Sequence, residues 1–300
     1  MKAYTSNNIR NIAVLGHGGK GKTTLCEAML YIAGASDRLG RVADGNTVLD
    51  FDSEEKRRKS SVSSAIAALE WDNTKLNIID APGLFDFEGG AAEAVRAAEA
   101  VLIVTSAGSG VDVGTEKAFR AAEKKGAAKF FAITKTDSDH RNFYKTFDAL
   151  KEVYGNKLCP TIIPYMEGNI TKCYVNLMTG MAFSYDENGK ATKVPVPEDS
   201  VIEEMPSAFM EAVATNDDAL MEKFFEGEKF TKEEILKGLC IGIFDGSIYP
   251  VYAVSGLTCA GVDQLLYGLA WSAPGAFGYA GEKCTYENGE EGILPCAENG

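Results

Sequence analysis

The chain has 300 residues, of which 45% are hydrophobic, and a formal net charge of −13. This composition is enough for a large core in one domain with an insert or in two domains, and the acidic balance excludes a protein that grips nucleic acid through a broad basic surface. Seven cysteines without a CxxC pair exclude a zinc site or disulfide framework, and the lack of a signal peptide or of any apolar run near ~20 residues predicts a cytoplasmic protein without membrane contact.

The first motif is a glycine-rich loop between an apolar run at 12–15, which predicts a strand, and a predicted helix at 24–32. Its spacing is GxxxxGKS/T, and the backbone N–H groups of such a loop turn inward around phosphate oxygens. Lys22 is expected to reach the β- and γ-phosphates, and the Thr23 hydroxyl to ligate Mg²⁺. A plain glycine-rich turn is the less specific alternative. The residues expected to bind the nucleotide here are His17, Gly18, Gly19, Lys20, Gly21, Lys22, Thr23 and Thr24.

A polar segment follows at 36–64, and its dense charge run at 52–59 has the composition of a solvated loop or helix face. Two strands are then predicted at 65–71 and 76–80, joined by a polar hairpin turn at 72–75. These two strands are expected to form a hairpin ahead of the alternating helices and strands.

The motif Asp80-Ala81-Pro82-Gly83 closes the second of these strands. A nucleoside triphosphatase needs a carboxylate at a strand end to hold Mg²⁺, usually through water, and a glycine whose N–H meets the γ-phosphate. Asp80 and Gly83 fit these two roles. Alone the motif is compatible with a simple turn, but its place downstream of a phosphate loop favours the nucleotide interpretation.

Helix and strand patterns then alternate, with helices predicted at 91–100, 116–125 and 143–154 and apolar strands at 101–105 and 130–134. A continuous apolar strand is buried on both faces, which is typical of a parallel sheet. The sequence therefore predicts an α/β fold of the P-loop nucleoside triphosphatase type, with a doubly wound, mostly parallel sheet.

Thr134-Lys135-Thr136-Asp137 stands at the end of the second apolar strand. The Asp137 carboxylate can accept two hydrogen bonds from guanine N1–H and the 2-amino group, a pair that adenine does not offer. The Lys135 stem can lie across the base. The familiar form of the motif is Asn-Lys-x-Asp, so Thr134 replaces an asparagine.

A further signal for the base is Ser255-Gly256-Leu257, which follows a predicted strand at 251–254 and precedes a helix at 262–271. A backbone N–H at this place can bind guanine O6. In isolation the tripeptide is also compatible with an ordinary loop.

The alternation stops after 159–160, and residues 174–183 and 185–194 then predict a hairpin with its turn around 187–189. Acidic helices are expected after it, near 198–214, 217–226 and 231–239. The sequence thus predicts an α+β insert between the Asp137 and Ser255 motifs. The expected division is a GTP-binding unit at 1–158 and 241–280, an inserted subdomain at 159–240, and a polar linker toward a further domain at 281–300.

In order and spacing, these motifs resemble those of translational GTPases, most closely the GTPase domain of translation elongation factor G, over nearly all of the chain. Residues 220–228 are similar to part of the extra subdomain that elongation factor G carries within its GTPase fold. The resemblance implies a GTPase that uses Mg²⁺ and converts GTP to GDP and phosphate. It also implies a longer protein whose partners are the ribosome and a recycling factor, and whose task is ribosomal translocation or recycling. No sequence-specific nucleic-acid contact is expected from this part.

The first switch of that family, an acidic-basic run ending in Arg-Gly-Ile-Thr-Ile, is similar to residues 52–62. The resemblance reassigns the charge run to this switch, and Ser61 takes the place of the threonine that senses Mg²⁺ and the γ-phosphate. The composition of 36–64 offers little to bury, so we expect the switch to be mobile without a γ-phosphate. The implied catalytic residues are Lys22, Ser61 and Gly83, and the implied metal ligands are Thr23, Ser61 and Asp80.

The chain differs from the family pattern at three residues of the predicted nucleotide site. Leu84 stands where the family has the histidine that positions the attacking water, Gly19 replaces an aspartate, and Thr134 replaces the asparagine. Leucine cannot orient or polarise a water, so we predict GTP binding with slow hydrolysis, partly restored by the ribosome. His17 is a weak substitute for this histidine, since it is expected to lie against a neighbouring strand. Lys20 either strengthens nucleotide binding, partly replaces a monovalent ion or points to solvent.

Two other functions stay open. A ribosomal protection-type GTPase is similar at residues 71–75, although the insert speaks against it. A non-hydrolysing guanine-nucleotide sensor or binding module is compatible with Leu84.

Overall fold

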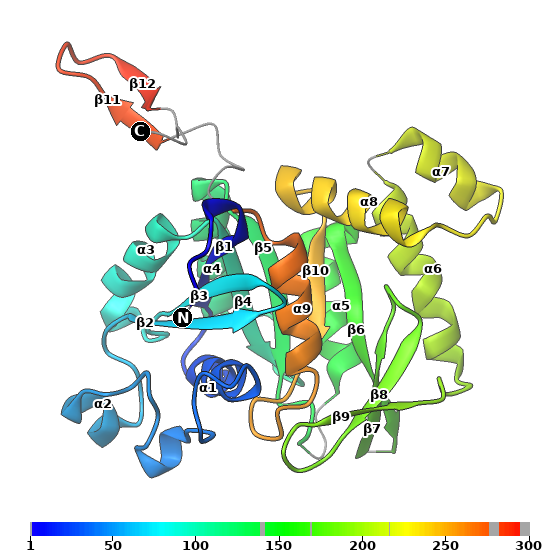
Figure 1. Cartoon of the computed structure of the whole chain (residues 1–300), viewed down its shortest axis with the longest axis horizontal. Coiled ribbons are helices and arrows are strands. Elements are labelled where there is room, and N and C mark those ends of the chain that lie inside the picture. Colours follow the sequence, from blue (N-terminus) through cyan, green and yellow to red (C-terminus); the bar gives the residue numbers. More distant parts are fainter. Residues whose placement is uncertain (1, 139–141, 169, 216, 276–281, 295–300) are drawn as a thin grey trace.

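The computed structural model describes residues 2–138, 142–168, 170–215, 217–275 and 282–294. Their main feature is a sheet of ten strands in the spatial order β2-β3-β1-β4-β5-β10-β6-β7-β8-β9 (Figure 1). The strands from β3 to β6 in this order run parallel, whereas β2 at one edge and β7, β8 and β9 at the other are antiparallel. The predicted α/β fold with a doubly wound, mostly parallel sheet is therefore confirmed.

The elements have the following bounds. The strands of the large sheet are β1 (Ile9–Leu15), β2 (Ala65–Trp71), β3 (Thr74–Asp80), β4 (Ala100–Ser106), β5 (Ala128–Thr134), β6 (Leu158–Glu167), β7 (Ile170–Asn176), β8 (Met181–Tyr185), β9 (Ala191–Val194) and β10 (Tyr249–Ala253). The helices are α1 (Lys22–Ile32), α2 (Ser53–Arg58), α3 (Glu88–Ala97), α4 (Val113–Lys125), α5 (Phe143–Tyr154), α6 (Ser200–Ala214), α7 (Asp218–Phe225), α8 (Lys232–Asp245) and α9 (Val262–Ser272). Short 3₁₀ segments are η1 (Ser6–Asn8), η2 (Val42–Asp44), η3 (Phe85–Phe87) and η4 (Gly155–Lys157).

The centre of the sheet is apolar because helices cover its strands. Every residue of β4 and β5 is buried, as are the last four residues of β1. Helices α1 and α9 pack against each other and against β3, while α4 packs on β4 and α5 on β5. Figure 1 shows α9 in front of the strands. Continuous apolar runs have no face that tolerates water, so they specify the parallel core.

Two helices differ in their bounds from the predicted ones. α3 covers Glu88–Ala97 rather than 91–100, and α4 begins at Val113 rather than at 116. Asp112 explains the start of α4, because its Oδ1 accepts a hydrogen bond from the Thr115 N–H at 2.9 Å. An N-cap residue just before the apolar pattern was the signal for this earlier start.

The large sheet continues into the region predicted as an insert, which corrects the expectation that the α/β pattern stops at 159–160. β6 pairs in parallel with β10 on one side and antiparallel with β7 on the other. Pro160 and Pro164 lie inside β6, and proline removes a ladder hydrogen bond, which explains why the pattern hid this strand. The register with β10 shifts directly after the pair Val251–Pro160.

The predicted strand at 174–183 is also wrong in one respect, because it is interrupted. β7 ends at Asn176 and β8 begins at Met181, with a turn between them that contains Gly180 at φ 64°. The predicted turn near 187–189 is confirmed as the connection between β8 and β9.

The predicted division differs from the described elements in two places. α8 runs from Lys232 to Asp245, through the expected boundary at 240–241. Within the expected linker at 281–300, the described residues form an antiparallel hairpin of β11 (Glu282–Thr285) and β12 (Glu291–Leu294). Among the helices that the structure describes, none combines the length and apolar character that crossing a membrane requires.

Candidate functional site

The phosphate loop, residues 16–23, connects the end of β1 to the start of α1. Gly16 has φ 141°, and a Cβ there would collide with the carbonyl oxygen of Val104 in β4. Gly21, at φ 89°, is the left-handed N-cap of α1. These glycines let the main chain turn sharply, so the free N–H groups at the start of α1 belong to the loop.

Two side chains of the Thr134–Asp137 motif fasten this loop to the end of β5. Thr134 Oγ1 lies 2.6 Å from the carbonyl oxygen of Lys20 and 3.0 Å from that of Thr105, so its single proton can serve either acceptor. Lys135 Nζ donates to the carbonyl oxygen of Gly19 at 2.7 Å. Thr134 therefore links β5 to the phosphate loop with a hydroxyl group in place of an amide.

Lys22 is buried in the loop and contacts the second motif. Its side chain is 6% exposed, and its Nζ donates to the carbonyl oxygen of Gly16 at 3.0 Å. Burial lowers the pKa of Lys22, and the carboxylate of Asp80 opposes this effect. A Cβ on Gly83 would collide with Lys22 Nζ and lie 2.8 Å from the backbone nitrogen of Gly18. Only glycine lets the main chain of the second motif lie this close to the loop.

The residues predicted to hold Mg²⁺ come from α1, the first switch and β3. Thr23 Oγ1 lies 3.1 Å from Ser61 Oγ, which donates to Asp50 Oδ1 at 2.7 Å. Asp80 is 1% exposed, and neither of its carboxylate oxygens has a hydrogen-bond partner among the described residues. Burial raises the pKa of Asp80 to about 7, although the Lys22 ammonium opposes the rise. Two hydroxyls and an unpartnered carboxylate are hard oxygen ligands, so these residues fit Mg²⁺.

This set is not a self-sufficient metal cage. Within the described ranges, no group of three or more His, Cys, Asp or Glu side chains is arranged to hold a metal ion. Mg²⁺ commonly binds one or two carboxylates together with substrate phosphates. Binding of the ion at Asp80 would therefore depend on a nucleotide.

Within the predicted switch at 36–64, the segment 47–63 is held at both ends by the buried carboxylates of Glu27 and Glu55, which the sequence did not reveal. Glu27 of α1 accepts hydrogen bonds from the two N–H groups at 48–49, at 2.7 and 3.0 Å. Glu55 accepts hydrogen bonds from the two N–H groups at 62–63, at 3.0 and 3.1 Å. These four contacts fix the segment that carries Ser61.

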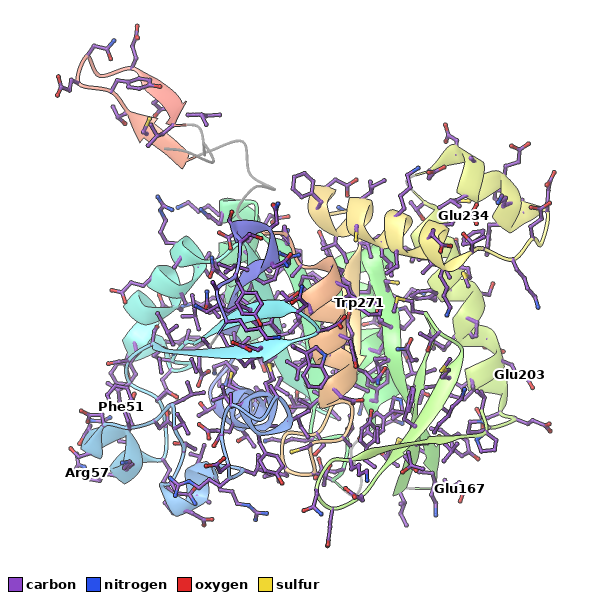
Figure 2. The ribbon with its side chains drawn as sticks, in the orientation of Figure 1. Phe51, Arg57, Glu167, Glu203, Glu234 and Trp271 are labelled. Atoms are coloured by element: carbon purple, nitrogen blue, oxygen red, sulfur yellow. The ribbon has the colours of Figure 1, made fainter. Side chains whose placement is uncertain are left out.

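The expectation that this switch has little to bury is wrong. α2 begins with a capping box of Asp52 and Glu55, a sequence pattern that could have identified the helix. Its outer side is solvated as the charge run indicated, and Figure 2 shows Phe51 and Arg57 at the outer edge of the molecule. The buried residues of the segment include Leu49, Asp50, Glu55 and Ser61.

Asp137, the residue predicted to select guanine, is exposed and lines a cavity of about 290 Å³. Strands β7 and β8 of the predicted insert contribute Tyr174 and Tyr185 to the same cavity. The Tyr174 hydroxyl lies 2.7 Å from Thr136 Oγ1, so β7 is attached to the motif itself. No local sequence pattern predicts this contribution, because the contact joins distant segments.

The second predicted base contact, Ser255-Gly256-Leu257, follows β10 and packs on α1. Ser255 Oγ accepts a hydrogen bond from the Thr258 N–H at 3.2 Å, and a Cβ on Gly256 would lie 3.0 Å from the backbone nitrogen of Leu25. β10 is the direct neighbour of β5. The two predicted base contacts therefore lie at the carboxyl ends of adjacent parallel strands, where ligands of open α/β sheets bind.

Lys20 does not point to solvent, which excludes one of the expectations for it. Its Nζ lies 3.0 Å from Asp112 Oδ2, and the two side chains are 17% and 22% exposed. Lys20 also lines an open cavity of about 510 Å³ together with other phosphate-loop residues, the segment 106–109 and Lys135. Two ammonium groups beside a glycine-rich loop are suited to an anionic ligand.

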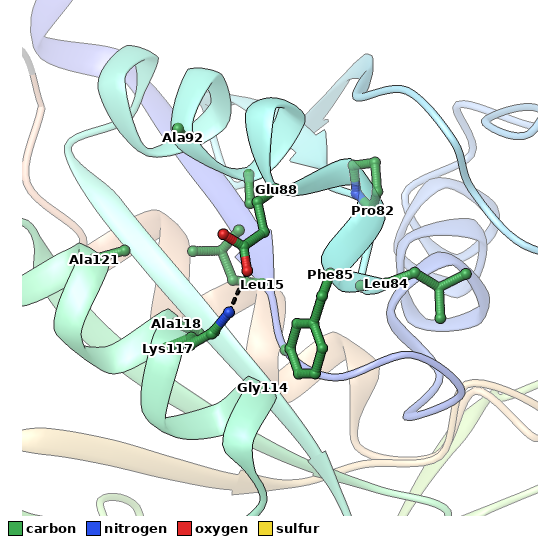
Figure 3. A pocket seen from close by; sticks show the side chains of 13 residues that line it. Leu15, Pro82, Leu84, Phe85, Glu88, Ala92, Gly114, Lys117, Ala118 and Ala121 are labelled. Carbon is green, nitrogen blue, oxygen red and sulfur yellow. Dashed lines mark hydrogen bonds and ion pairs between the residues drawn. The ribbon is translucent and has the colours of Figure 1, made fainter.

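Leu84 and His17 lie beside the phosphate loop without forming a polar pair. Leu84 is 39% exposed, and its Cδ2 lies 3.0 Å from the position of a Cβ on Gly18. The His17 ring packs edge-on against Phe85, which Figure 3 shows beside Leu84, with 5.6 Å between ring centroids. Its Nδ1 lies 3.0 Å from the Gly18 carbonyl oxygen. The side of the loop next to Gly83 is therefore covered by apolar surface.

Comparison with known proteins gives consistent results. The family model of the elongation factor Tu GTP-binding domain matches residues 7–274. Two relatives named elongation factor G-like protein, from two strains of Mycobacterium tuberculosis, are 33% identical over 261 residues, 86% of this chain and 36% of each relative. A crystal structure from Thermus thermophilus is similar with a TM-score of 0.84 and 34% identity, over 92% of this chain and 42% of that chain. The chain thus spans less than half the length of these relatives.

Proposed function

The chain belongs to the family of the elongation factor Tu GTP-binding domain, and we propose that it is the nucleotide switch of a longer elongation factor G-like protein that hydrolyses GTP slowly until it meets the ribosome. The observation that carries the proposal is the phosphate loop with Lys22 buried beside Gly83. Members of this family bind guanine nucleotides and are GTPases. In this chain the bound nucleotides are GTP and GDP, together with Mg²⁺.

Binding of Mg²⁺ together with the nucleotide is supported by the oxygen atoms around Asp80. A buried carboxylate without partners is costly, and a divalent cation beside it would relieve that cost. Thr23 and Ser61 would add two hydroxyl ligands. The ion supplies charge neutralisation for the phosphates, while this chain's residues orient it and keep water out.

Slow hydrolysis is supported by the apolar side of the loop. Lys22 and the Gly83 N–H are suited to bind terminal phosphate oxygens, but Leu84 has no group that could orient a water. His17 is engaged with Phe85. A partner that brings a polar group to this side would raise the rate, as does an arginine supplied in trans in other GTPases.

Single-turnover hydrolysis of GTP, measured with and without ribosomes, tests the proposal. We expect slow turnover of the domain alone and faster turnover when the full-length protein is mixed with ribosomes. Fast turnover without ribosomes would contradict the slow-hydrolysis part. A matched binding control is Asp137→Asn, which should weaken GDP binding and leave the fold intact because the side chain is exposed.

A non-hydrolysing guanine-nucleotide sensor is the second candidate function, and Leu84 is the observation that favours it. Under this alternative, neither ribosomes nor Mg²⁺ would produce turnover although GTP binds. A ribosomal protection-type factor remains compatible with the same domain, and residues outside this chain would separate it from translocation or recycling. The cytoplasmic location is part of the same proposal, and so is a division into a GTP-binding unit and an insert near 159–240, with β6 and α8 crossing the expected boundaries.

A further inference from the structure

Thr136, which precedes the predicted guanine-selecting residue Asp137, contacts two other parts of the sheet through its side chain. It is 3% exposed, and its Oγ1 lies 3.0 Å from the carbonyl oxygen of Val254, directly after β10. The same Oγ1 lies 2.7 Å from the Tyr174 hydroxyl of β7. A carbonyl oxygen can only accept, so the single Thr136 hydroxyl proton goes to Val254 and the Tyr174 hydroxyl donates to Thr136. One chain of hydrogen bonds therefore runs from β7 through the Asp137 motif to the end of β10.

A second hydroxyl of β7 fixes the main chain at the same place. Thr171 Oγ1 donates to the carbonyl oxygen of Thr136 at 2.7 Å. Thr171 and Tyr174 thus hold the main-chain and the side-chain oxygen of a single residue. Both belong to the part of the chain predicted as an insert, so this part is attached to the nucleotide motifs.

The Asp137 motif needs such contacts because its main chain is strained. Lys135 has φ 59°, in the left-handed region that a lysine rarely adopts. A conformation of this kind persists only where the surrounding structure fixes it. Thr134 fixes the chain before Lys135 through its contacts with the carbonyl oxygens of Lys20 and Thr105, and Thr136 fixes it after Lys135.

Asp137 itself depends on these contacts. Its side chain is exposed, and its carboxylate makes no hydrogen bond or ion pair with another described residue. The direction of the carboxylate is therefore set by the main chain at 134–136. A carboxylate that accepts two parallel hydrogen bonds must be aligned with both donors, so a small rotation of this main chain would weaken the pair.

Tyr174 has a hydroxyl that packing alone does not require. Its ring packs edge-on against Tyr185, with 5.5 Å between ring centroids, and a phenylalanine ring would pack in the same way. Tyr174 is 4% exposed, and a buried hydroxyl is costly unless it is hydrogen-bonded. The position of Thr136 provides that partner directly beside Asp137.

We propose that Tyr174 is a positioning residue for guanine selection, an inference that rests on the proposed function. Its hydroxyl holds Thr136, and Thr136 holds the Asp137 carboxylate in the direction from which it accepts both hydrogen bonds of guanine. Tyr174 acts on the base only through these two residues. The strand β7 is then a component of the base site, and the region predicted as an insert contributes to the choice of nucleotide.

Competition titrations with GDP and with inosine diphosphate, both with Mg²⁺, test the proposal. Inosine diphosphate lacks the 2-amino group and offers Asp137 a single hydrogen bond, so the ratio of the two affinities reports the alignment of the carboxylate. We expect the parent to prefer GDP by roughly tenfold or more, because hydrogen bonds to charged groups are strong. Tyr174→Phe should lower this preference by about threefold or more.

Tyr144→Phe is the matched control. The Tyr144 hydroxyl donates to the carbonyl oxygen of Pro164 in β6, also at 2.7 Å, and contacts neither base motif, so this variant should keep the parent's preference. Thr136→Val removes the acceptor of the Tyr174 hydroxyl and retains the shape of the side chain. It should lower the preference at least as much as Tyr174→Phe, and the double variant should lower it no further. Thermal melts verify folding, and if Tyr174→Phe fails to fold, Thr136→Val tests the same hydrogen bond from its other end.

Equal weakening of both nucleotides in Tyr174→Phe, or parent-like affinities for both, would overturn the proposal, since a hydroxyl that only stabilises the fold does not distinguish the two bases. A larger loss in the double variant than in Thr136→Val would overturn the route through Thr136. A parent that binds neither nucleotide, or both equally, would contradict the proposed function at Asp137. A parent that prefers GDP, with a Tyr174→Phe variant that keeps this preference, would overturn the role of Tyr174 alone.

Discussion

The two sides of the phosphate loop are built on different principles. On the side of the base motifs, Thr134 and Lys135 bind loop carbonyl oxygens and Lys20 is paired with Asp112. On the switch side, which carries the predicted first switch and the Asp80–Gly83 motif, both carboxylate oxygens of Asp80 lack partners among the described residues, and Leu84 covers the loop with apolar surface. The first side is a preorganised binding frame, while the second is completed only by ligands. The difference explains why we expect binding to be autonomous and hydrolysis to need help.

Replacing Lys22, which lies between the two sides of the phosphate loop, should have the largest effect on nucleotide binding. Lys22→Ala deletes the ammonium that lies beside Gly83 and the phosphate loop, and we expect GDP affinity to fall roughly a hundredfold, because charge-assisted bonds to phosphates are strong. Fluorescence titration with a labelled GDP measures it. Lys129→Ala, at a buried lysine far from the loop in β5, controls for general loss of a charge. Affinity within about threefold of the parent would contradict the role of Lys22.

Because the carboxylate of Asp80 is buried without a partner, we expect the free energy of unfolding to depend on pH. Burial raises the pKa of Asp80 to about 7, so the folded protein binds this proton more tightly than the unfolded chain does. The stabilisation is complete below about pH 4 and is lost as pH rises through about 7, with an upper bound of about 4 kcal/mol. Asp80→Asn should therefore remove part of the fall in unfolding free energy between pH 5 and 8. Urea melts without Mg²⁺ or nucleotide measure this difference, and parallel pH curves for parent and variant would contradict it.

The apolar surface of the switch side can be changed at one residue. Leu84→His restores a side chain that can orient water, and we expect single-turnover hydrolysis without ribosomes to become roughly ten- to a hundredfold faster. Leu84→Ala opens the same space without an imidazole and should stay slow. An unchanged rate in Leu84→His would show that the missing histidine does not limit hydrolysis.

On the side of the base motifs we expect a smaller change in GDP affinity, which distinguishes two roles of Lys20. If Lys20 neutralises Asp112 near the phosphates, Lys20→Ala should weaken GDP binding by about tenfold, since a carboxylate then faces the anion. Asp112→Asn keeps the α4 cap and should bind at least as well as the parent. The double variant should return to within about threefold of the parent. Equal losses of GDP affinity in both single variants would indicate instead that the Lys20–Asp112 ion pair acts by holding the phosphate loop in position.

The sequence allowed the fold and the loop to be predicted because both follow from local patterns. The glycine spacing at 16–23 and the apolar run of β4 are each contained in a few consecutive residues. The contacts that were missed join distant segments, such as Glu27 with the first switch. β6 was missed because the prolines inside it carry a signal against strands, and only its pairing with β10 overrides that signal.

Calorimetric titration of the purified domain with GDP and with ADP, both with Mg²⁺, tests the central claim most directly. The account predicts binding of GDP with one site per chain and little or no heat with ADP, because Asp137 accepts hydrogen bonds that only guanine donates. No binding of GDP, or equal affinity for ADP, would contradict it.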